Sequence, residues 1–297
     1  MIKVTGKGGI TAKVIADSIA NGIRLTTLEL YYHQLIHKQF MTHRMLSRNA
    51  SSGRAIPANK VLEKVRTETS MPIFWGKDQP GMQADEENVF FDEKIGGECY
   101  QFLAGEFSPQ MMWKDAAHYV AKNAAMFADA GYHKQIVNRL TEPFQHIKVI
   151  VTATEWDNFF ALRLHHASQP EIQELARCMK EAMDSSVPTK LSHGEWHLPY
   201  VEIGEVMLGT KAEAIKCSVA RCARVSYNNH DNSTPGITKD TKLADTLQAD
   251  GHMSPFEHQA TPLNTPWEDG CTHMDRKGNF WSGNFRGWIQ NRQLLGA

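Results

Sequence analysis

The order of apolar and polar residues near the N-terminus is typical of a β-hairpin. Val14 to Ile19 and Leu25 to Tyr32 read as short strands, the second with Leu residues set among Thr, Glu and Tyr. Between them stands Asn21-Gly22, a pair in which both residues accept positive φ. Further along, the β-branched run from Ile147 to Thr152 predicts a buried strand.

Apolar residues at helical spacing, and the breakers between them, predict helices along much of the remaining chain. A further helix is expected after Ser168-Gln-Pro-Glu171, which fits a capping box. The other predicted helices span 33–49, 59–66, 113–130, 156–164, 211–224, 239–249 and 284–295. Residues 72–88, rich in Pro and Gly, predict a loop insertion. Strand pairs mixed with long helices predict an α+β fold with a mixed or antiparallel sheet.

Composition excludes several classes of protein. The chain has 297 residues, 41% of them hydrophobic, which is ordinary for a globular protein and long enough for one large domain. Lys and Arg number 32 against 33 Asp and Glu, so a broad basic face for nucleic acid is not expected. No stretch approaches the roughly 20 apolar residues of a membrane span. Five scattered Cys without a zinc spacing predict a cytoplasmic protein with no structural metal.

The first candidate site lies between Gln39 and Arg54. Three Arg, His43, two amides and the small residues Ser51-Ser52-Gly53 occur together there. Arginine forks and hydroxyls beside a flexible glycine suit a phosphate, so the pattern favours an anion site. A solvated helix end with a Ser/Gly cap is the alternative interpretation.

Two more groups of residues are candidates for chemistry. In the middle of the chain, Arg139 precedes Asn158 and Arg163, which can flank a shared pocket; the alternative is that Arg163 extends to the solvent past Phe159 and Phe160. Near the C-terminus, 252–258 ends in Glu257-His258, a pair suited to proton transfer or, alternatively, to a helix cap.

Together these segments resemble the flavin-dependent thymidylate synthase family. That family's signature is R-H-R-x-x-S-x-N-E-x-S-x-R, preceded by a Gln. The matching residues here are Gln39, Thr42-His43-Arg44, Ser47, Asn49 and Ser52-Gly53-Arg54. The family's later segments are similar to Arg139, Asn158 to Arg163, Ser168 to Ile172, Ala223 to Tyr227 and His252 to His258.

The sequence departs from the family in three ways. Thr42 stands in place of the first Arg of the signature, and Ala50 in place of the Glu that the family uses at the nucleotide. The Ser-Pro-Phe-Glu-His segment follows the signature here, within the C-terminal stretch 200–297, whereas in the family it precedes it. The resemblance therefore implies a single catalytic domain over 1–297 with a rearranged or partly duplicated segment order. It is similar to long divergent forms from bacteriophages, which would place it in the host cytoplasm.

The resemblance implies an enzyme that methylates dUMP at C5 to give dTMP. Such enzymes bind FAD, use NADPH to reduce it, take the carbon from methylenetetrahydrofolate, and form homotetramers with active sites shared between subunits. By position, Arg163 would be catalytic and would favour the ionised pyrimidine N3. The residues implied for FAD are His43, Arg44, Asn158, Ser226 and His258. The residues implied for the nucleotide are Gln39, Ser52, Gly53, Arg54, Arg139 and Arg163.

Two other functions stay open at this stage. The changes at Thr42 and Ala50 motivate hydroxymethylation of dUMP or dCMP, as modified phage DNA requires. A non-catalytic relative that binds nucleotides or RNA is the other. In each case we expect Arg44, Arg48, Arg54, Arg139 and Arg163 to concentrate positive charge for small anions within a nearly neutral chain.

Overall fold

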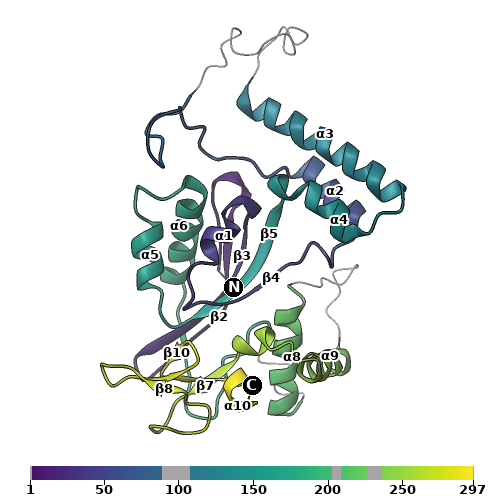
Figure 1. Cartoon of the computed structure of the whole chain (residues 1–297). Helices are drawn as coiled ribbons and strands as arrows, with labels where there is room; N and C mark the ends of the chain where they lie inside the picture. Colours follow the sequence, from purple (N-terminus) through teal and green to yellow (C-terminus); the bar gives the residue numbers. More distant parts are fainter. Residues whose placement is uncertain (1, 89–107, 203–208, 226–235, 297) are drawn as a thin grey trace, which may run out of the picture.

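A mainly antiparallel sheet of six strands organises the fold. The computed structural model describes residues 2–88, 108–202, 209–225 and 236–296, and over these ranges the protein is α+β, with nine α-helices and two further small sheets (Figure 1). The predicted hairpin is confirmed as β2 (Thr11–Ala20) and β3 (Ile23–His33). Asn21 and Gly22 turn it with φ of 50° and 75°.

Strand β5 (His146–Ala153) joins the hairpin to the rest of the sheet. It pairs antiparallel with β3 along eight residues and with β4 (Ser47–Ala50) on its other side. At the far side of the hairpin, β2 pairs with β1 (Lys3–Thr5) and, in parallel, with β6 (Thr189–Lys190). A short 3-10 turn, η1 (Lys7–Gly9), connects β1 to β2.

The helix predicted over 33–49 is wrong beyond its first turns. Helical structure is limited to η2 (Gln34–Ile36) and α1 (His37–Phe40), after which the chain turns and enters β4. The apolar residues Leu35, Ile36, Phe40 and Met45 match a helical period, but the backbone at Ser47 pairs with Thr152, about a hundred residues away. A pairing so distant in the sequence leaves no local signal.

One face of the sheet packs against α6 (Pro170–Asp184) and α5 (Asp157–Arg163), which Figure 1 shows side by side. Leu28, Leu30, Val149 and Val151 point to this core. The predicted helical face of α6 is confirmed, since Ile172, Leu175 and Met179 are fully buried in the same core.

The predicted capping box at the start of α6 is wrong. Gln169 is the N-cap, and the Ser168 hydroxyl donates to the carbonyl of Leu162. The Glu171 carboxylate accepts from the backbone N–H of Ile73, so it binds the 72–88 segment rather than its own helix. That segment has no helix and no strand, as predicted, and its residues 76 and 87 form an isolated bridge.

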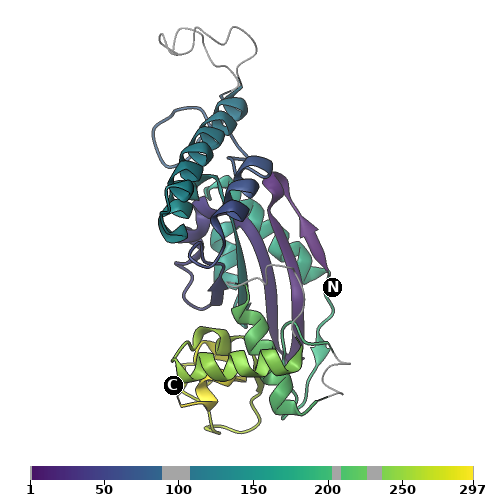
Figure 2. The same ribbon diagram turned by 90° about the vertical axis from the view of Figure 1, so that its right-hand side faces the viewer.

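Three helices form a separate layer at one end of the strands (Figure 2). They are α2 (Ala58–Thr67), α3 (Pro109–Asp129) and α4 (Lys134–Leu140), and the first two confirm predicted helices. Their core joins Val61, Leu62 and Val137 to the alanines of α3. The short turn η4 (Glu142–Phe144) then leads from α4 into β5.

The C-terminal part lies at the other end of the strands (Figures 1 and 2). Helices α8 (Lys211–Ala223) and α9 (Ile237–Ala249) confirm two predictions, and η5 (Ser254–Glu257) follows them. Two small sheets come next. One pairs β7 (Ala260–Pro262) with β11 (Trp288–Gln290), and the other comprises β8 (His273–Met274), β9 (Phe280–Ser282) and β10 (Phe285–Arg286).

The helix predicted over 284–295 is therefore wrong except for α10 (Asn291–Leu294). Phe285 and Trp288, three residues apart, suggested one helical face, yet each belongs to a short strand. Both side chains are fully buried with Leu25 and Ala260. Burial in strands thus produced the spacing that resembles a helix.

A buried polar layer joins the second face of the sheet to the C-terminal part. The His197 ring bonds to the hydroxyls of Ser18 and Thr27 at 2.8 Å each. The Thr27 hydroxyl bonds to that of Thr152, which in turn bonds to Nδ1 of His258 at 2.8 Å. Such a network stabilises one arrangement only while its members keep their partners.

None of the described helices is long and apolar enough to cross a bilayer.

Acid should weaken this layer. Burial lowers the pKa of both His197 and His258 to about 3, whereas in the unfolded chain each ring takes up a proton near pH 6.5. Between these values the unfolded state binds more protons, so stability is complete above pH 6.5 and falls as the pH drops. Each ring contributes a slope of up to about 1.4 kcal/mol per pH unit.

In the variant His258→Asn the amide oxygen can still accept from Thr152. Between pH 6.5 and 4.5 its free energy of unfolding should depend on pH less steeply than in the parent, by about one such slope. Urea unfolding at three pH values measures this. The same exchange at exposed His252 is the control. Parallel profiles for His258→Asn and the parent would show that His258 does not titrate on unfolding.

Candidate functional site

The loop after β4 and helix α4 form the first group of candidate residues. The buried Asn138 side chain donates from Nδ2 to the carbonyls of Gly53 (2.6 Å) and Ile56 (3.0 Å). Nζ of Lys134 donates to the carbonyl of Ala55. Three bonds from one helix therefore hold the loop that contains Ser52-Gly53-Arg54 against the helix that contains Arg139.

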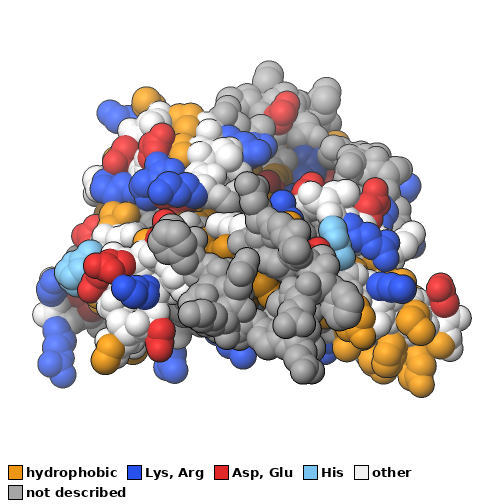
Figure 3. Space-filling view, turned by 90° about the horizontal axis from the view of Figure 1, so that it is seen from above, with side chains coloured by type: hydrophobic (Ala, Val, Ile, Leu, Met, Phe, Trp, Pro, Cys, Tyr) orange, Lys and Arg blue, Asp and Glu red, His pale blue; other side chains and the backbone are white. Residues whose placement is uncertain are grey.

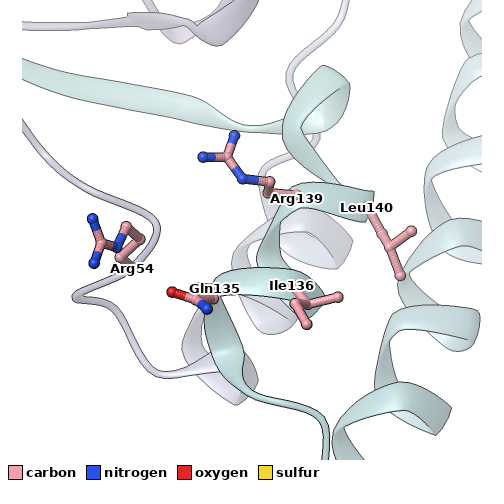
Figure 4. Close-up of a pocket in the computed structure, with 5 residues that line it drawn as sticks. All are labelled: Arg54, Gln135, Ile136, Arg139 and Leu140. Atoms are coloured by element: carbon pink, nitrogen blue, oxygen red, sulfur yellow. The ribbon is translucent and has the colours of Figure 1, made fainter.

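Arg54 and Arg139 line a common pocket of about 550 Å³ with Gln135, Ile136 and Leu140 (Figure 4). An adjoining cavity of about 100 Å³ is lined by Ser52 and Gly53 together with both arginines. The structure thus brings together four of the six residues implied for the nucleotide. Arg54 is exposed and has no side-chain partner in the described part of the chain, while Arg139 pairs with Glu142 at 3.2 Å.

The chemistry of this pocket suits a phosphate. Two guanidinium groups approach it from different elements, and each offers paired N–H donors that match phosphate oxygens. The Ser52 hydroxyl accepts from the backbone N–H of Arg54 and keeps its own proton for a ligand. The apolar side chains of Ile136 and Leu140 lie on the side away from Arg54 (Figure 4).

A second group surrounds His43, in the turn between α1 and β4. Nε of Arg163 donates to Nε2 of His43 at 2.9 Å, so the ring proton is on Nδ1. The His43 ring is only 8% exposed and packs edge-on against Phe159. Burial, and after it the charges of Arg163 and Arg48, lowers the pKa of His43 to about 4. The ring is therefore neutral at physiological pH, and the positive charge of the pair is on Arg163 alone.

Arg163 and Gln39 line a different cavity, of about 910 Å³. Its other walls come from the 72–85 segment and from the start of α6. The Gln39 amide donates to the side chain of Gln169. Within this chain, Gln39 and Arg163 are thus separated from the pocket of Arg54 and Arg139, although the resemblance placed all of them at one nucleotide.

The sheet keeps the two groups apart. Helix α4 and η4 lead into the start of β5, and α5 begins after its last residue, so Arg139 and the first turn of α5 flank opposite ends of that strand. The eight residues of β5 are joined by seven steps of about 3.4 Å, so the strand is roughly 24 Å long. Strand β4, which runs antiparallel to β5, lies between His43 and Arg54 in the sequence.

The residues implied for FAD have different surroundings. Arg44 and Asn158 are exposed, and neither side chain has a partner within the described ranges. His258 is fully buried, with Nδ1 bonded to Thr152 and Nε2 without a partner among the described residues, and so is not open to a ligand from the surface in this arrangement. Ser226 lies outside the described residues.

Arg48 has a structural role that we did not expect. Its Nη1 donates to the carbonyls of His43 (2.8 Å) and Met41 (3.0 Å), and more weakly to that of Phe40. It therefore caps the end of α1 and fixes the turn that contains His43. Its share in an anion site stays a prediction.

Sequence reasoning missed Gln135 and Asn138. Gln135 lies one helical turn before Arg139 and lines the same pocket. The i, i+4 rule applied to α4 would have found it. Asn138 offered no such signal, because its role is to bond backbone carbonyls of a loop more than eighty residues away.

Comparison with known proteins adds no assignment. No protein-family model matches the chain, and no curated protein matches it.

The Arg54 pocket should bind phosphate. Arg54→Ala and Arg139→Ala should each weaken binding of inorganic phosphate at low ionic strength, because a lost charge-assisted bond costs about 1–3 kcal/mol, or roughly 5- to 150-fold. Calorimetric titration measures this. Arg66→Ala, which removes an exposed charge from α2, is the matched control. Equal affinity in all four proteins would show that the pocket is not a phosphate site.

Proposed function

We propose that the protein is a flavin-dependent thymidylate synthase that methylates dUMP at C5. The observation that supports this most strongly is the composition of its two separated groups. One offers two arginines, a serine and a glycine for a phosphate, and the other offers an arginine held by a neutral histidine. These are the residues that match the family signature, and they come from distant parts of the chain.

The geometry of Arg163 suits a role at the pyrimidine. Its Nε is bound to His43, and its Nη2 reaches the Thr42 hydroxyl only at 3.5 Å. Nη1 has no partner among the described residues, and the guanidinium lines the 910 Å³ cavity. A guanidinium fixed on one side and open on the other can stabilise negative charge at N3 and an adjacent carbonyl oxygen of uracil. That charge raises electron density at C5, where the new carbon is bound.

The exposed residues suit a flavin. The Arg44 fork can bind a pyrophosphate, and the Asn158 amide offers a donor and an acceptor for the polar edge of a ring system. When bound, reduced FAD would supply the hydride that converts the transferred methylene into a methyl group. NADPH would provide the reducing equivalents, and methylenetetrahydrofolate would provide the carbon.

A site shared between subunits follows from the separation of the two groups. Within one chain they line different pockets, Arg54 and Arg139 one and Gln39 and Arg163 the other. Helices α3 and α4 expose large apolar side chains, and Figure 3 shows such side chains gathered at the edge where α3 ends in Figure 1. The exposed apolar residues of the end of α3, of α4 and of the turn between them are Met126, Phe127, Tyr132, Ile136 and Leu140. An apolar surface next to the phosphate pocket supports self-association, in agreement with the homotetramer that the resemblance implies.

The test of the reaction is direct. Purified protein incubated with FAD, NADPH, methylenetetrahydrofolate and dUMP should form dTMP, as measured by mass spectrometry. Arg163→Ala should lower turnover by about 10²- to 10³-fold, because it removes the group that stabilises the developing charge, while bound flavin absorbance persists. Arg177→Ala, an exposed arginine of α6, is the control.

The products of the same incubation separate the alternatives. A product with an extra oxygen, or a requirement for dCMP, would indicate hydroxymethylation. Protein that acquires no flavin spectrum and forms no product would contradict the enzymatic proposal and favour a nucleotide-binding relative.

Mixing two inactive variants tests the shared site. Arg54→Ala and Arg163→Ala alter different groups, so a mixed oligomer should contain sites in which both groups are intact. With random assembly, about a quarter of the sites regain both groups, and a comparable fraction of activity should return. If one chain supplied both groups, no mixture would be active. Each variant incubated alone is the control.

A further inference from the structure

Residues Asn284–Arg286, at the start of β10 in the C-terminal part, contact both segments that hold the His43–Arg163 pair. Asn284 contacts the turn after His43, where its Nδ2 donates to the carbonyl of Met45 (2.9 Å) and to the hydroxyl of Ser47 (3.0 Å). The Ser47 hydroxyl donates back to Oδ1 of Asn284. This short contact joins residues 237 positions apart in the sequence.

Two residues later, Arg286 contacts the loop that leads into α5. Its backbone N–H donates to the hydroxyl of Thr154 at 3.1 Å. Its Nε donates to the Glu155 carboxylate at 2.6 Å, with both side chains about one-third exposed. Helix α5, which ends at Arg163, begins at Asp157.

The segment between these contacts is rigidly held. Phe285 is fully buried with Leu25 and Trp288 in a core of its own. Gln290, 1% exposed, donates to Ser47, to the carbonyl of Glu257 and to Asn284, and so supports the first contact from behind.

We propose that Asn284–Arg286 is a positioning element for the His43–Arg163 pair. It ties the turn that contains His43 to the loop that precedes α5 and so sets the distance across which Arg163 reaches the ring. None of these residues lines the described pockets of the two groups, so they act through His43 and Arg163. The positioning stands on contacts within the chain, while its consequence for turnover rests on the proposed function.

The test uses two variants of the full chain, Asn284→Ala and Arg286→Ala, and follows the His43 ring by ¹⁵N NMR. In the parent, the ring should be neutral with its proton on Nδ1, and its pKa should be near 4. In both variants Arg163 should move away and water should reach the ring. Its pKa should then rise by about one unit or more toward 6.5, and the Nδ1–H form should no longer dominate.

Two further variants make the result specific. Glu155→Gln keeps an oxygen that accepts from Arg286 and should preserve the parent spectrum, whereas Glu155→Ala should reproduce Arg286→Ala. Arg292→Ala breaks the ion pair with Glu257 in the same C-terminal part without touching either segment, and should leave His43 unchanged. Folded Asn284→Ala and Arg286→Ala proteins with the parent His43 spectrum would overturn the proposal. So would an equal change in Arg292→Ala.

Kinetics provide a second measurement in the proposed reaction. A displaced Arg163 should lower kcat by roughly 10- to 100-fold with little change in KM for the nucleotide, because phosphate binding depends on the other group. If the parent proves to have no such activity, the proposed function fails, and the NMR result still decides the positioning.

Discussion

The pairing of β5 with a strand on each side is the constraint on which the other features depend. Because β3 and β4 both pair with it antiparallel, every segment that enters or leaves this part of the sheet is directed to one of its two ends. The loop of Arg54 and helix α4 lie at the end where β5 begins, and the turn of His43 and helix α5 at the end where it finishes. The positions of the Arg54 loop and of the His43 turn are therefore set by strand pairing.

The two faces of the sheet are held by different physical means. One is an ordinary apolar core against α5 and α6, which tolerates modest repacking. The other meets the C-terminal part through smaller apolar clusters and also through histidine and threonine side chains, whose hydrogen bonds each need a particular partner at a particular distance. A polar contact of this kind fixes position more strictly than an apolar one, because a shifted chain leaves buried polar groups unpaired. This strict docking allows Asn284 and Arg286 to act on distant segments.

Local patterns predicted most of the fold but failed at particular places. The hairpin, β5 and the helices α2, α3, α5, α6, α8 and α9 have short-range signals such as a turn dipeptide or a repeated apolar face, whereas α4 was not predicted. Ser47–Ala50 and Trp288–Gln290 became strands only because β5 and β7 lie beside them, and a single sequence does not contain that information. The candidate site divides in the same way. Arg54 and Arg139 stood out by residue type, whereas Asn138 and Asn284 matter for the backbone carbonyls that they bind.

The distribution of ion pairs explains how a chain with a net charge of −1 can present sites for anions. Several carboxylates are bound to structural arginines: Asp17 to Arg24, Asp240 to both Arg221 and Arg224, and Glu174 to Arg177. Two arginines of the candidate groups have no carboxylate partner among the described residues, whereas Arg139 pairs with Glu142. Arg54 has no partner in the described part of the chain, and Arg163 is bound by a histidine that burial keeps neutral. A neutral donor-acceptor partner orients a guanidinium without cancelling its charge, whereas a carboxylate would orient it and cancel it. The choice of His43 as the partner of Arg163 is therefore what leaves a fixed cation available to a ligand.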